Sequence, residues 1–371
     1  NEKYHKWLAY FMENMRLRVI IKTISTVFLV ILLLSGFFGF LERLTTQWFS
    51  HPIIQTLAFL AVFGLITTLI SLPFDAYATF VIEEKYGFNK TTLKTFILDF
   101  LKNLALILFL GGGLVALINW IYLQFVGRIG LFILIAWLVI TLVTLILFVL
   151  NTKVFVKIFN KLTPLAEGSL RDSIQVLAEK FGFNINAISV MDASKRSTKL
   201  NAFFSGLGKT REVVLYDTLL EKLEEENVLF VLAHELGHAL HKDVPRLLIQ
   251  QVLIFAFYAV VLGLILQSDA LAQAFGLSGA QLGFGILLFS ILISPLNLLI
   301  SIPLNALSRK AEYAADAFAA RQVGKRASQD AFRILAQENL ANLTPHPLYV
   351  WLHYDHPSTP QRLQAIEDLE L

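Results

Sequence analysis

Long runs of apolar residues dominate the pattern of this chain. Four runs of about 20 residues stand out, at positions 19–40, 53–72, 131–150 and 247–266, and the last three contain no charged residue. A helix rises about 1.5 Å per residue, and the hydrocarbon core of a bilayer is about 30 Å thick. Each run is therefore long enough to cross a membrane as one helix.

Two further apolar runs carry polar residues or helix breakers. Residues 95–118 contain Asp99 and Lys102, and residues 284–302 contain Pro295 and Asn297. Such residues persist at membrane depth where they face other parts of the protein or a wet cavity. The pattern leaves two readings open, a kinked helix packed against its neighbours or the lining of a functional cavity. Either way it predicts six spans.

In the remaining segments, hydrophobic residues recur with the periodicity of amphipathic helices and strands, as in a water-facing domain. We expect helices at 170–181, 224–243, 308–323, 328–339 and 361–371, and strands at 187–191, 201–205 and 212–215 with a turn at 206–209. Residues 161–169 read as a loop. The chain is thus divided into a membrane region at 1–150, a water-facing part at 151–246, two further spans within 247–302, and a second water-facing part at 303–371.

Composition supports this division. Hydrophobic residues make up 56% of the 371 residues and charged residues only 16%, with no cysteine. A disordered chain and a disulfide scaffold are excluded. A net charge of +3 gives no basis for binding nucleic acid, which requires a basic face.

The distribution of Lys and Arg predicts the orientation. With six spans, 1–18, 73–94, 151–246 and 303–371 share one side of the membrane. The two short segments of this side hold Lys3, Lys6, Arg16, Arg18, Lys85, Lys90 and Lys94. The opposite side has only Arg43 and Arg128, and its loop at 267–283 has neither residue type. Because short basic loops stay in the cytoplasm, both water-facing parts are expected there.

The expected helix at 224–243 carries the sequence HELGH at 234–238. Residues four apart share a helix face, so His234 and His238 can bind one ion, and Glu235 can reach a water on that ion. This is the H-E-x-x-H arrangement of zinc peptidases. A motif of five residues also occurs by chance, and the alternative is a helix with two incidental histidines beside a solvated Glu. The residues that precede the motif on this helix are apolar, which indicates a buried helix. This argues against that alternative, because burying unliganded polar groups is unfavourable.

A catalytic zinc needs a third protein ligand and an open position. The metzincin spacing would place this ligand at 244, which is Val244. Glu312 fits best among the remaining carboxylates, and Asp316, one turn further on, could hydrogen-bond a ligating histidine. The alternative is a solvated helix face that pairs with Arg309. Glu338 and Glu367 are weaker candidates. The two spans between the motif and Glu312 form a hairpin that would return both helices to the same side.

These residues and five further stretches resemble the integral-membrane zinc peptidases called CAAX prenyl proteases, of the a-factor-converting type. The stretches are FVIEEKYGFN at 80–89, SKRS at 194–197, NAFFSG at 201–206, SPLN at 294–297 and HYDHPSTPQR at 353–362. The resemblance implies a mainly α fold. Seven membrane helices would form a barrel around a water-filled chamber, with a gluzincin-like peptidase domain that contains a small β-sheet. Since six spans are counted, the family's first helix is expected upstream of residue 1.

The resemblance also implies roles for individual residues. His234, His238 and Glu312 are implied to bind one zinc ion per chain, with Glu235 as the base that activates water and Asp316 as the partner of a ligand. Asn201, Ala202 and Phe203 lie in the implied edge strand that aligns the substrate backbone. His356 and Arg362 are implied to bind the substrate carbonyl or stabilise the oxyanion. Structural alternatives are a turn at His356, a solvated helix start at Arg362 and a strand cap at Asn201.

The implied reaction is hydrolysis of a peptide bond near the C-terminus of a prenylated protein or peptide, at the cytoplasmic side of a membrane and in contact with its lipids. The segment 221–227 is short where eukaryotic members carry a long charged insertion. This favours a bacterial inner-membrane protein and leaves the prenyl group of the substrate open. The alternatives are a quality-control metalloprotease of membrane proteins that cuts unprenylated substrates, and a transporter or lipid-binding protein with a structural zinc.

Overall fold

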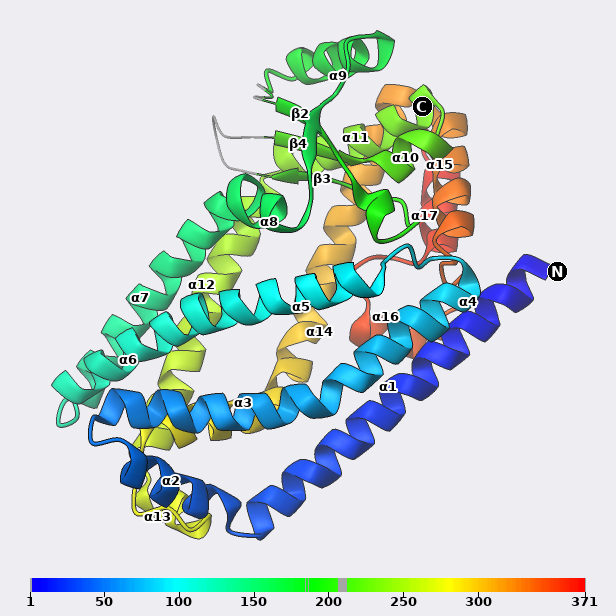
Figure 1. Cartoon of the computed structure of the whole chain (residues 1–371). Helices are drawn as coiled ribbons and strands as arrows, with labels where there is room; N and C mark the ends of the chain where they lie inside the picture. Colours follow the sequence, from blue (N-terminus) through cyan, green and yellow to red (C-terminus); the bar gives the residue numbers. More distant parts are fainter. Residues whose placement is uncertain (1, 184, 186, 206–211, 371) are drawn as a thin grey trace.

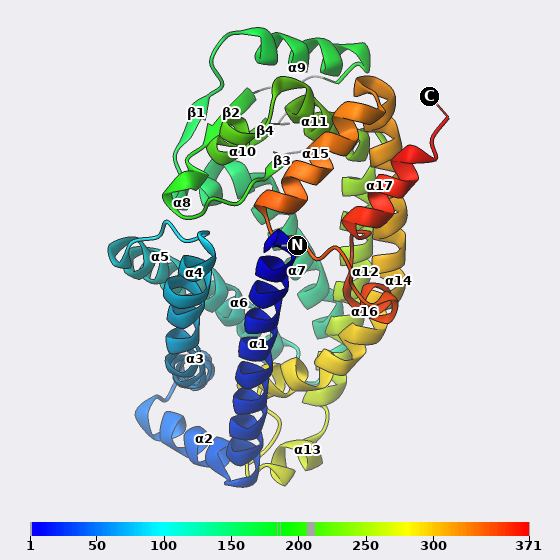
Figure 2. The same cartoon turned by 90° about the vertical axis from the view of Figure 1, so that its right-hand side faces the viewer.

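The computed structural model describes residues 2–183, 185, 187–205 and 212–370. Helices dominate these residues, and one small mixed sheet lies at one end of the molecule, as the sequence predicted (Figure 1). The turn expected at 206–209 lies outside the described residues. Figure 2 shows the sheet and α9 (Ser169–Lys180) at the end opposite to α2 (Phe37–Trp48) and α13 (Asp269–Ala274).

Six helical stretches are long and apolar enough to cross a membrane: Tyr4–Leu34, Pro52–Tyr86, Leu93–Gln124, Ile129–Phe159, Asp243–Leu266 and Leu282–Val323. They consist of α1 (Glu2–Leu34), α3 (Pro52–Tyr77), η1 (Ala78–Glu83), α4 (Glu84–Tyr86), α5 (Leu93–Leu106), η2 (Ile107–Gly111), α6 (Gly112–Gln124), α7 (Ile129–Leu150), η3 (Asn151–Val156), α8 (Lys157–Phe159), α12 (Asp243–Leu266) and α14 (Leu282–Val323), where these three η segments are π-helical. The shorter remaining helices are η4 (Ala193–Lys195, 3₁₀), α10 (Asp217–Lys222), α11 (Glu225–Leu240), α15 (Lys325–Glu338), α16 (Pro347–His353) and α17 (Thr359–Glu367).

The first span ends earlier than the apolar pattern indicates. The run at 19–40 predicts a helix through position 40, whereas α1 ends at Leu34 and a new helix begins at Phe37. Gly36 lies between them with φ of 73°, a left-handed conformation that glycine adopts without a steric penalty. The chain therefore turns at Gly36.

The polar residues of the two weaker spans are paired with other parts of the protein. Arg196 donates two hydrogen bonds to Asp99, at 2.7 and 3.0 Å. The Tyr258 hydroxyl on α12 donates to Asn297 Oδ1 at 2.6 Å. Neither Asp99 nor Asn297 lines the two cavities of the metal centre described below. These contacts favour the packing interpretation over the cavity lining.

The sheet has the strand order β1-β2-β4-β3. The strands are β1 (Leu162–Pro164), β2 (Ala187–Met191), β3 (Ala202–Ser205) and β4 (Glu212–Tyr216). β2 and β4 are parallel and the outer pairs are antiparallel, so β3 forms one edge. β1 was expected in a loop, because three residues that include Pro164 give no strand periodicity. The sheet packs on α11 through Leu215 and Leu232, both almost fully buried.

The helix of the H-E-x-x-H motif is α11. It begins with Glu225 and Glu226, whose charges suit the N-terminal dipole, and it ends before Lys242, which has φ of 58°. The sequence predicted one helix through position 243. The left-handed turn at Lys242 instead separates α11 from α12.

α14 crosses the whole molecule as one helix of 42 residues (Figure 1). α14 continues through Pro303, whereas the sequence predicted a span at 284–302 and a separate helix at 308–323. This prediction is wrong. A proline removes one backbone donor, but the helical hydrogen bonds on either side persist where neighbouring helices pack against the segment. The continuity of α14 carries Glu312 from the membrane part directly to α11.

Close contact between α11 and α14 depends on Gly237. A Cβ atom at this position would lie 3.1 Å from Ala315 Cα and 3.3 Å from Phe318 Cδ1. We expect Gly237→Val to destabilise the protein by about 1–3 kcal/mol through overpacking. Thermal unfolding in detergent measures this. Gly64→Val is the matched control, because a Cβ at Gly64 meets no atom within 4 Å. Equal melting temperatures for the two variants would contradict the prediction.

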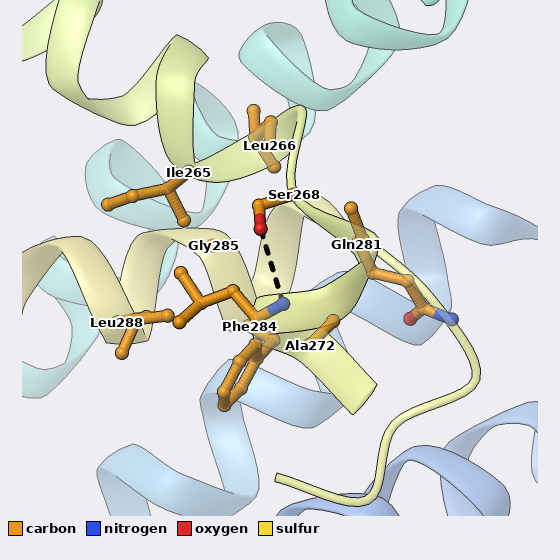
Figure 3. Close-up of a pocket in the computed structure, with 10 residues that line it drawn as sticks. Ile265, Leu266, Ser268, Ala272, Gln281, Phe284, Gly285 and Leu288 are labelled. Carbon is orange, nitrogen blue, oxygen red and sulfur yellow. Dashed lines mark hydrogen bonds between the residues drawn. The ribbon is translucent and has the colours of Figure 1, made fainter. Parts of the chain in front are cut away.

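The far end of the molecule is closely packed. Figure 3 shows the small interstice where α12, α13 and the start of α14 meet, with Ser268 accepting a hydrogen bond from the Leu271 backbone. Its volume is only about 10 Å³, room for about one water molecule. A Cβ atom on Gly285 would lie 2.6 Å from Leu266 Cδ2. This meeting point of α12, α13 and α14 is therefore closely packed, in contrast to the two cavities at the metal centre described below.

Candidate metal centre

His234 and His238 face one another on α11. Their Nε2 atoms are 3.1 Å apart and the ring planes are perpendicular. The spacing of one helical turn brings both imidazoles to one side of the helix, as the sequence predicted. His234 is buried and His238 is partly buried.

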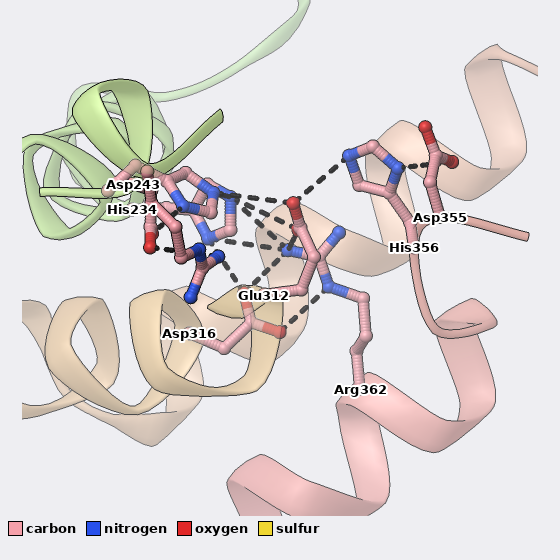
Figure 4. Close-up of polar contacts among 9 residues, drawn as sticks. His234, Asp243, Glu312, Asp316, Asp355, His356 and Arg362 are labelled. Carbon is pink, nitrogen blue, oxygen red and sulfur yellow. Dashed lines mark hydrogen bonds and ion pairs between the residues drawn. The ribbon is translucent and has the colours of Figure 1, made fainter. Parts of the chain in front are cut away.

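Glu312 approaches the same point from α14. Its Oε1 lies 3.3 Å from His238 Nε2, and its Oε2 lies 3.4 Å from His234 Nε2. One atom from each of the three residues lies within 4.8 Å of the others. Figure 4 shows the carboxylate of Glu312 between His234 and His356. Tertiary packing of α11 on α14 thus brings together three side chains that lie up to 78 positions apart in the sequence, from 234 to 312.

Each histidine is oriented by a carboxylate at its other nitrogen. Asp316 Oδ1 lies 2.8 Å from Nδ1 of His234, and Asp243 Oδ2 lies 2.8 Å from Nδ1 of His238. We infer that each Nδ1–H donates to its carboxylate, which leaves the Nε2 lone pair free for a cation. Asp316 was expected here, but Asp243 was missed. The only signal for Asp243 was an acidic residue five positions after His238, where the chain turns into the next helix.

The donor set fits a divalent metal such as zinc. The two Nε2 atoms are 3.1 Å apart, close to the edge of about 3.3 Å that tetrahedral ligation at 2.0–2.1 Å requires, and each of them has one Glu312 oxygen within 3.4 Å. Glu312 Oε2 is buried and accepts no hydrogen bond from the described residues, although Arg362 Nη2 lies 3.1 Å away with poor hydrogen-bond geometry. A buried oxygen without a donor is unfavourable unless a cation balances it.

Arg362 lies beside the centre and binds Asp316. Its Nε and Nη2 donate to the two oxygens of Asp316 at 2.7 and 2.6 Å, and its guanidinium lies 4.4 Å from the centre of the Phe332 ring. Burial opposes the charge, but Asp316 and Glu312 outweigh it and raise the pKa of Arg362. Only 13% of the side chain is exposed, so Arg362 holds Asp316 in place as well as adding positive charge to the cavity wall.

His356 lies on the opposite side of the Glu312 carboxylate from His234 (Figure 4). Its Nε2 is 3.1 Å from Glu312 Oε1 and its Nδ1 is 2.8 Å from Asp355 Oδ1. Hydrogen bonds with Asp355 and Glu312 raise the pKa of His356 to about 10, so the ring is an imidazolium at neutral pH. With 55% of the side chain exposed, this cation remains accessible to a ligand.

Two cavities meet at the centre, and both are lined by Glu235, His356 and two of the three candidate metal ligands, His234 and Glu312. The larger has a volume of about 520 Å³ and extends between α12 and α14. The smaller has a volume of about 220 Å³ and extends to the sheet. Glu235 lies where the two cavities meet, beside the predicted position of the ion.

The edge strand reaches the smaller cavity with only part of the expected residues. Asn201 and Ala202 line it. Phe203 does not, because successive residues of a strand point to opposite faces. The Phe203 side chain packs instead on Met191 and Tyr216 on the other face of the sheet. Asn339, which sequence reasoning missed, lies at the same cavity.

Metal uptake should depend on pH through His238. Burial alone would lower the pKa of this histidine, but hydrogen bonds with Glu312 and Asp243 outweigh burial and raise it to about 9 in the metal-free protein. A ligating imidazole must be neutral, so binding at neutral pH releases its proton. We expect the apparent metal affinity to rise about tenfold per pH unit from neutrality to about pH 9 and then to level off.

A competition titration against a coloured chelator at several pH values measures this dependence. Asp243→Asn is the matched control, because loss of the carboxylate removes one of the groups that raise the pKa of His238. The slope in this variant should be shallower above neutrality. An affinity of the unsubstituted protein that stays constant over this range would refute the titration of a ligand.

Family models match almost the entire chain. The N-terminal model of CAAX prenyl proteases, described as five membrane helices, matches residues 1–161. The model of peptidase family M48 matches residues 164–370. The two models together cover both the membrane region and the metal centre.

Relatives and a solved structure agree with these matches. The chain is 34% identical to CAAX prenyl protease 1 homolog of Arabidopsis thaliana over 86% of this chain and 74% of the relative. It is 33% identical to CAAX prenyl protease 1 homolog of Homo sapiens, over 92% and 81%. The crystal structure of S. mikatae Ste24p superposes with a TM-score of 0.93 and 28% identity, over 99% of this chain and 89% of the other.

The comparisons confirm the resemblance derived from the sequence. They also confirm a multi-span α-helical membrane protein with a metallopeptidase domain. The chain belongs to peptidase family M48 and is an integral-membrane metalloendopeptidase of the CAAX prenyl protease type.

Proposed function

We propose that this chain is a zinc-dependent endopeptidase that cleaves near the C-terminus of prenylated proteins or peptides at the cytoplasmic side of a membrane. One observation carries the proposal: two imidazoles and a carboxylate from two helices converge, and Glu235 lies beside them at the meeting point of two cavities. A structural zinc site would need neither a free carboxylate nor an open cavity.

His234, His238 and Glu312 would hold the zinc ion, with Asp316 and Asp243 fixing the two rings. When bound, zinc polarises the scissile carbonyl and lowers the pKa of its water ligand. Glu235 accepts the proton of the attacking water and transfers it to the leaving amine. The two cavities give the peptide a path past Glu235 on both sides.

The charge that develops on the carbonyl oxygen requires a positive partner. His356 supplies it, because its imidazolium is exposed to the cavity and adjoins Glu312. Arg362 adds positive charge from a fixed position on Asp316. Asn201 and Ala202 align the peptide by strand addition at the free edge of β3. Phe203 contributes to this role only by supporting the strand.

The peptidase domain in this proposal consists of residues 151–246 and 303–371, joined by the two spans within 247–302. The Lys and Arg residues of 1–18 and 73–94 support a cytoplasmic position of this domain. The membrane spans give a lipid tail an apolar surrounding next to the centre. The short segment 221–227 supports a bacterial inner membrane, and relatives named as CAAX prenyl proteases support a prenylated substrate.

The test is cleavage of a farnesylated C-terminal peptide and of its unlipidated twin by the purified protein with zinc. The proposal expects the farnesylated peptide to be cut more efficiently. Equal cleavage of both would favour quality-control proteolysis. Cleavage of neither peptide, with or without zinc, would overturn the proposal and favour a transport or lipid-binding role.

A further inference from the structure

The outer edge of β3 can be read from its pairing with β4. Asn201 C=O accepts a hydrogen bond from Tyr216 N–H at 3.2 Å, and Phe203 is opposite Val214 two residues further on. In an antiparallel pair, residues whose backbone groups bond the partner alternate with residues whose groups point away. The N–H and C=O groups of positions 200, 202 and 204 therefore point to the free edge.

Asn339 already occupies this edge at Leu200. Its side-chain Oδ1 accepts from Leu200 N–H at 2.8 Å, and its Nδ2 donates to Leu200 C=O at 3.1 Å. One amide group thus replaces a neighbouring strand at a single residue. Asn339 is the C-cap of α15 and its own N–H bonds Leu335 C=O, so the amide is held by the end of a helix.

The next backbone N–H that points to the free edge, that of Ala202, has a different hydrogen-bond acceptor. Ala202 N–H donates to Oδ1 of Asn201 at 2.9 Å. The Asn201 side chain is exposed and belongs to the adjacent residue, so a single rotation uncovers the donor. Within the described part of the chain, the C=O of Ala202 and the backbone groups of Phe204 have no hydrogen-bond partner on the outer side.

The start of the strand is fixed from two more directions. Lys199 C=O accepts from the Thr218 hydroxyl at 2.8 Å. Lys199 Nζ lies 3.0 Å from Glu83 and donates to the Tyr10 hydroxyl at 2.9 Å. These contacts tie position 199 to α1 and η1 of the membrane part. Leu200 therefore cannot move away from Asn339 without breaking contacts on both sides.

Asn339 also lies at the end of the edge that is nearest to the metal centre. The smaller cavity is lined by Leu200, Ala202 and Asn339 together with Glu235 and Glu312. Phe204 does not line it, so the free part of the edge leads away from the centre. A peptide that pairs along β3 has to leave the sheet where it meets Asn339, in the cavity that Glu235 also lines.

We propose that Asn339 is a positioning residue for peptide hydrolysis: its amide closes the edge of β3 at Leu200, so that a bound peptide pairs only at Ala202 and Phe204. This inference rests on the proposed function, in which β3 aligns the substrate. By ending the strand pairing, Asn339 fixes which peptide bond lies beside Glu235. It touches neither the metal ligands nor the scissile bond.

The experiment maps the cleavage site as well as the rate. Asn339→Ala and Asn339→Leu remove both hydrogen bonds, and the Leu variant keeps most of the side-chain volume if the Ala variant folds poorly. Asn342→Ala is the matched control, since Asn342 caps a local turn through Thr344 N–H. Each protein is given a farnesylated peptide series that varies in length on both sides of the cleaved bond, and products are identified by mass spectrometry.

Without the Asn339 amide, Leu200 offers one more pairing position. A strand repeats its hydrogen-bonding pattern every second residue, so we expect a second product displaced by two residues. We also expect kcat/KM at the original bond to fall about tenfold, mainly through KM, because the peptide can then bind along β3 in a second register that does not place the original bond beside Glu235. The Asn342→Ala variant should keep one product and an unchanged KM.

A lower melting temperature with one cleavage site and unchanged KM in both Asn339 variants would overturn the inference, and Asn339 would then only stabilise the fold. This outcome leaves the proposed function intact. If the unsubstituted protein cleaves no peptide of the series, the proposed function fails and this inference fails with it. The two failures are therefore distinguished by the unsubstituted protein alone.

Discussion

Replacement of Glu235 by Gln is expected to abolish peptide cleavage while the metal stays bound. The amide has the shape of the carboxylate but cannot take a proton from water. General acid–base catalysis contributes about 10²–10⁴-fold to a rate, so we expect kcat to fall by about a thousandfold, which corresponds to about 4 kcal/mol in activation free energy. Glu235 is not one of the three candidate metal ligands, His234, His238 and Glu312, so the metal content should not change.

The measurement combines peptide turnover with elemental analysis of the same sample. Glu226→Gln is the matched control, because Glu226 lies in the first turn of the same helix and is exposed. It should retain full activity. Normal turnover by Glu235→Gln with zinc bound would remove the assignment of the base.

Replacement of Glu312 by Ala is expected to lose the metal itself. Two histidines alone leave a catalytic zinc one protein ligand short. The change also leaves a gap at a buried position, where only 6% of the Glu312 side chain is exposed, and removes the carboxylate that lies between His238 and His356. After dialysis we expect less than about a tenth of the metal of the unsubstituted protein, and no measurable cleavage.

Elemental analysis after dialysis against a weak chelator measures the loss. Glu338→Ala is the control. The sequence made Glu338 a weaker candidate for the third metal ligand, and it does not lie with His234, His238 and Glu312 in the structure. It should keep its metal. Unchanged zinc in Glu312→Ala would refute Glu312 as a ligand, whatever the effect on activity.

Local patterns predicted the local features well. The strands at 187–191 and 212–215 and the helix at 170–181 agree with β2, β4 and α9 within one residue. These elements are specified by alternation or by a helical period that neighbours in the sequence already contain. The H-E-x-x-H motif is local in the same way, because one turn of α11 is sufficient to bring His234 and His238 together.

Contacts between distant segments were predicted less completely. Glu312 was named because a third ligand was required, whereas Asp243 and Asn339 were missed. Neither has a spacing that marks it: Asp243 depends on the turn at Lys242, and Asn339 depends on how α15 ends beside β3. The two helices predicted at 284–302 and 308–323 form one helix, because helix packing in the membrane part outweighs the loss of one hydrogen bond at Pro303.

By itself, the sequence determined that six stretches are apolar and long enough to cross a membrane, which helix carries the two histidines and which family the protein resembles. These depend on hydropathy and spacing, which are properties of short segments. Only the tertiary structure decided that Glu312 meets both histidines, that Arg362 is bound to Asp316, and that the edge of β3 is closed at Leu200. Hydrogen bonds and ligation act over about 3 Å, so they are set by how helices and strands pack, which no local pattern encodes.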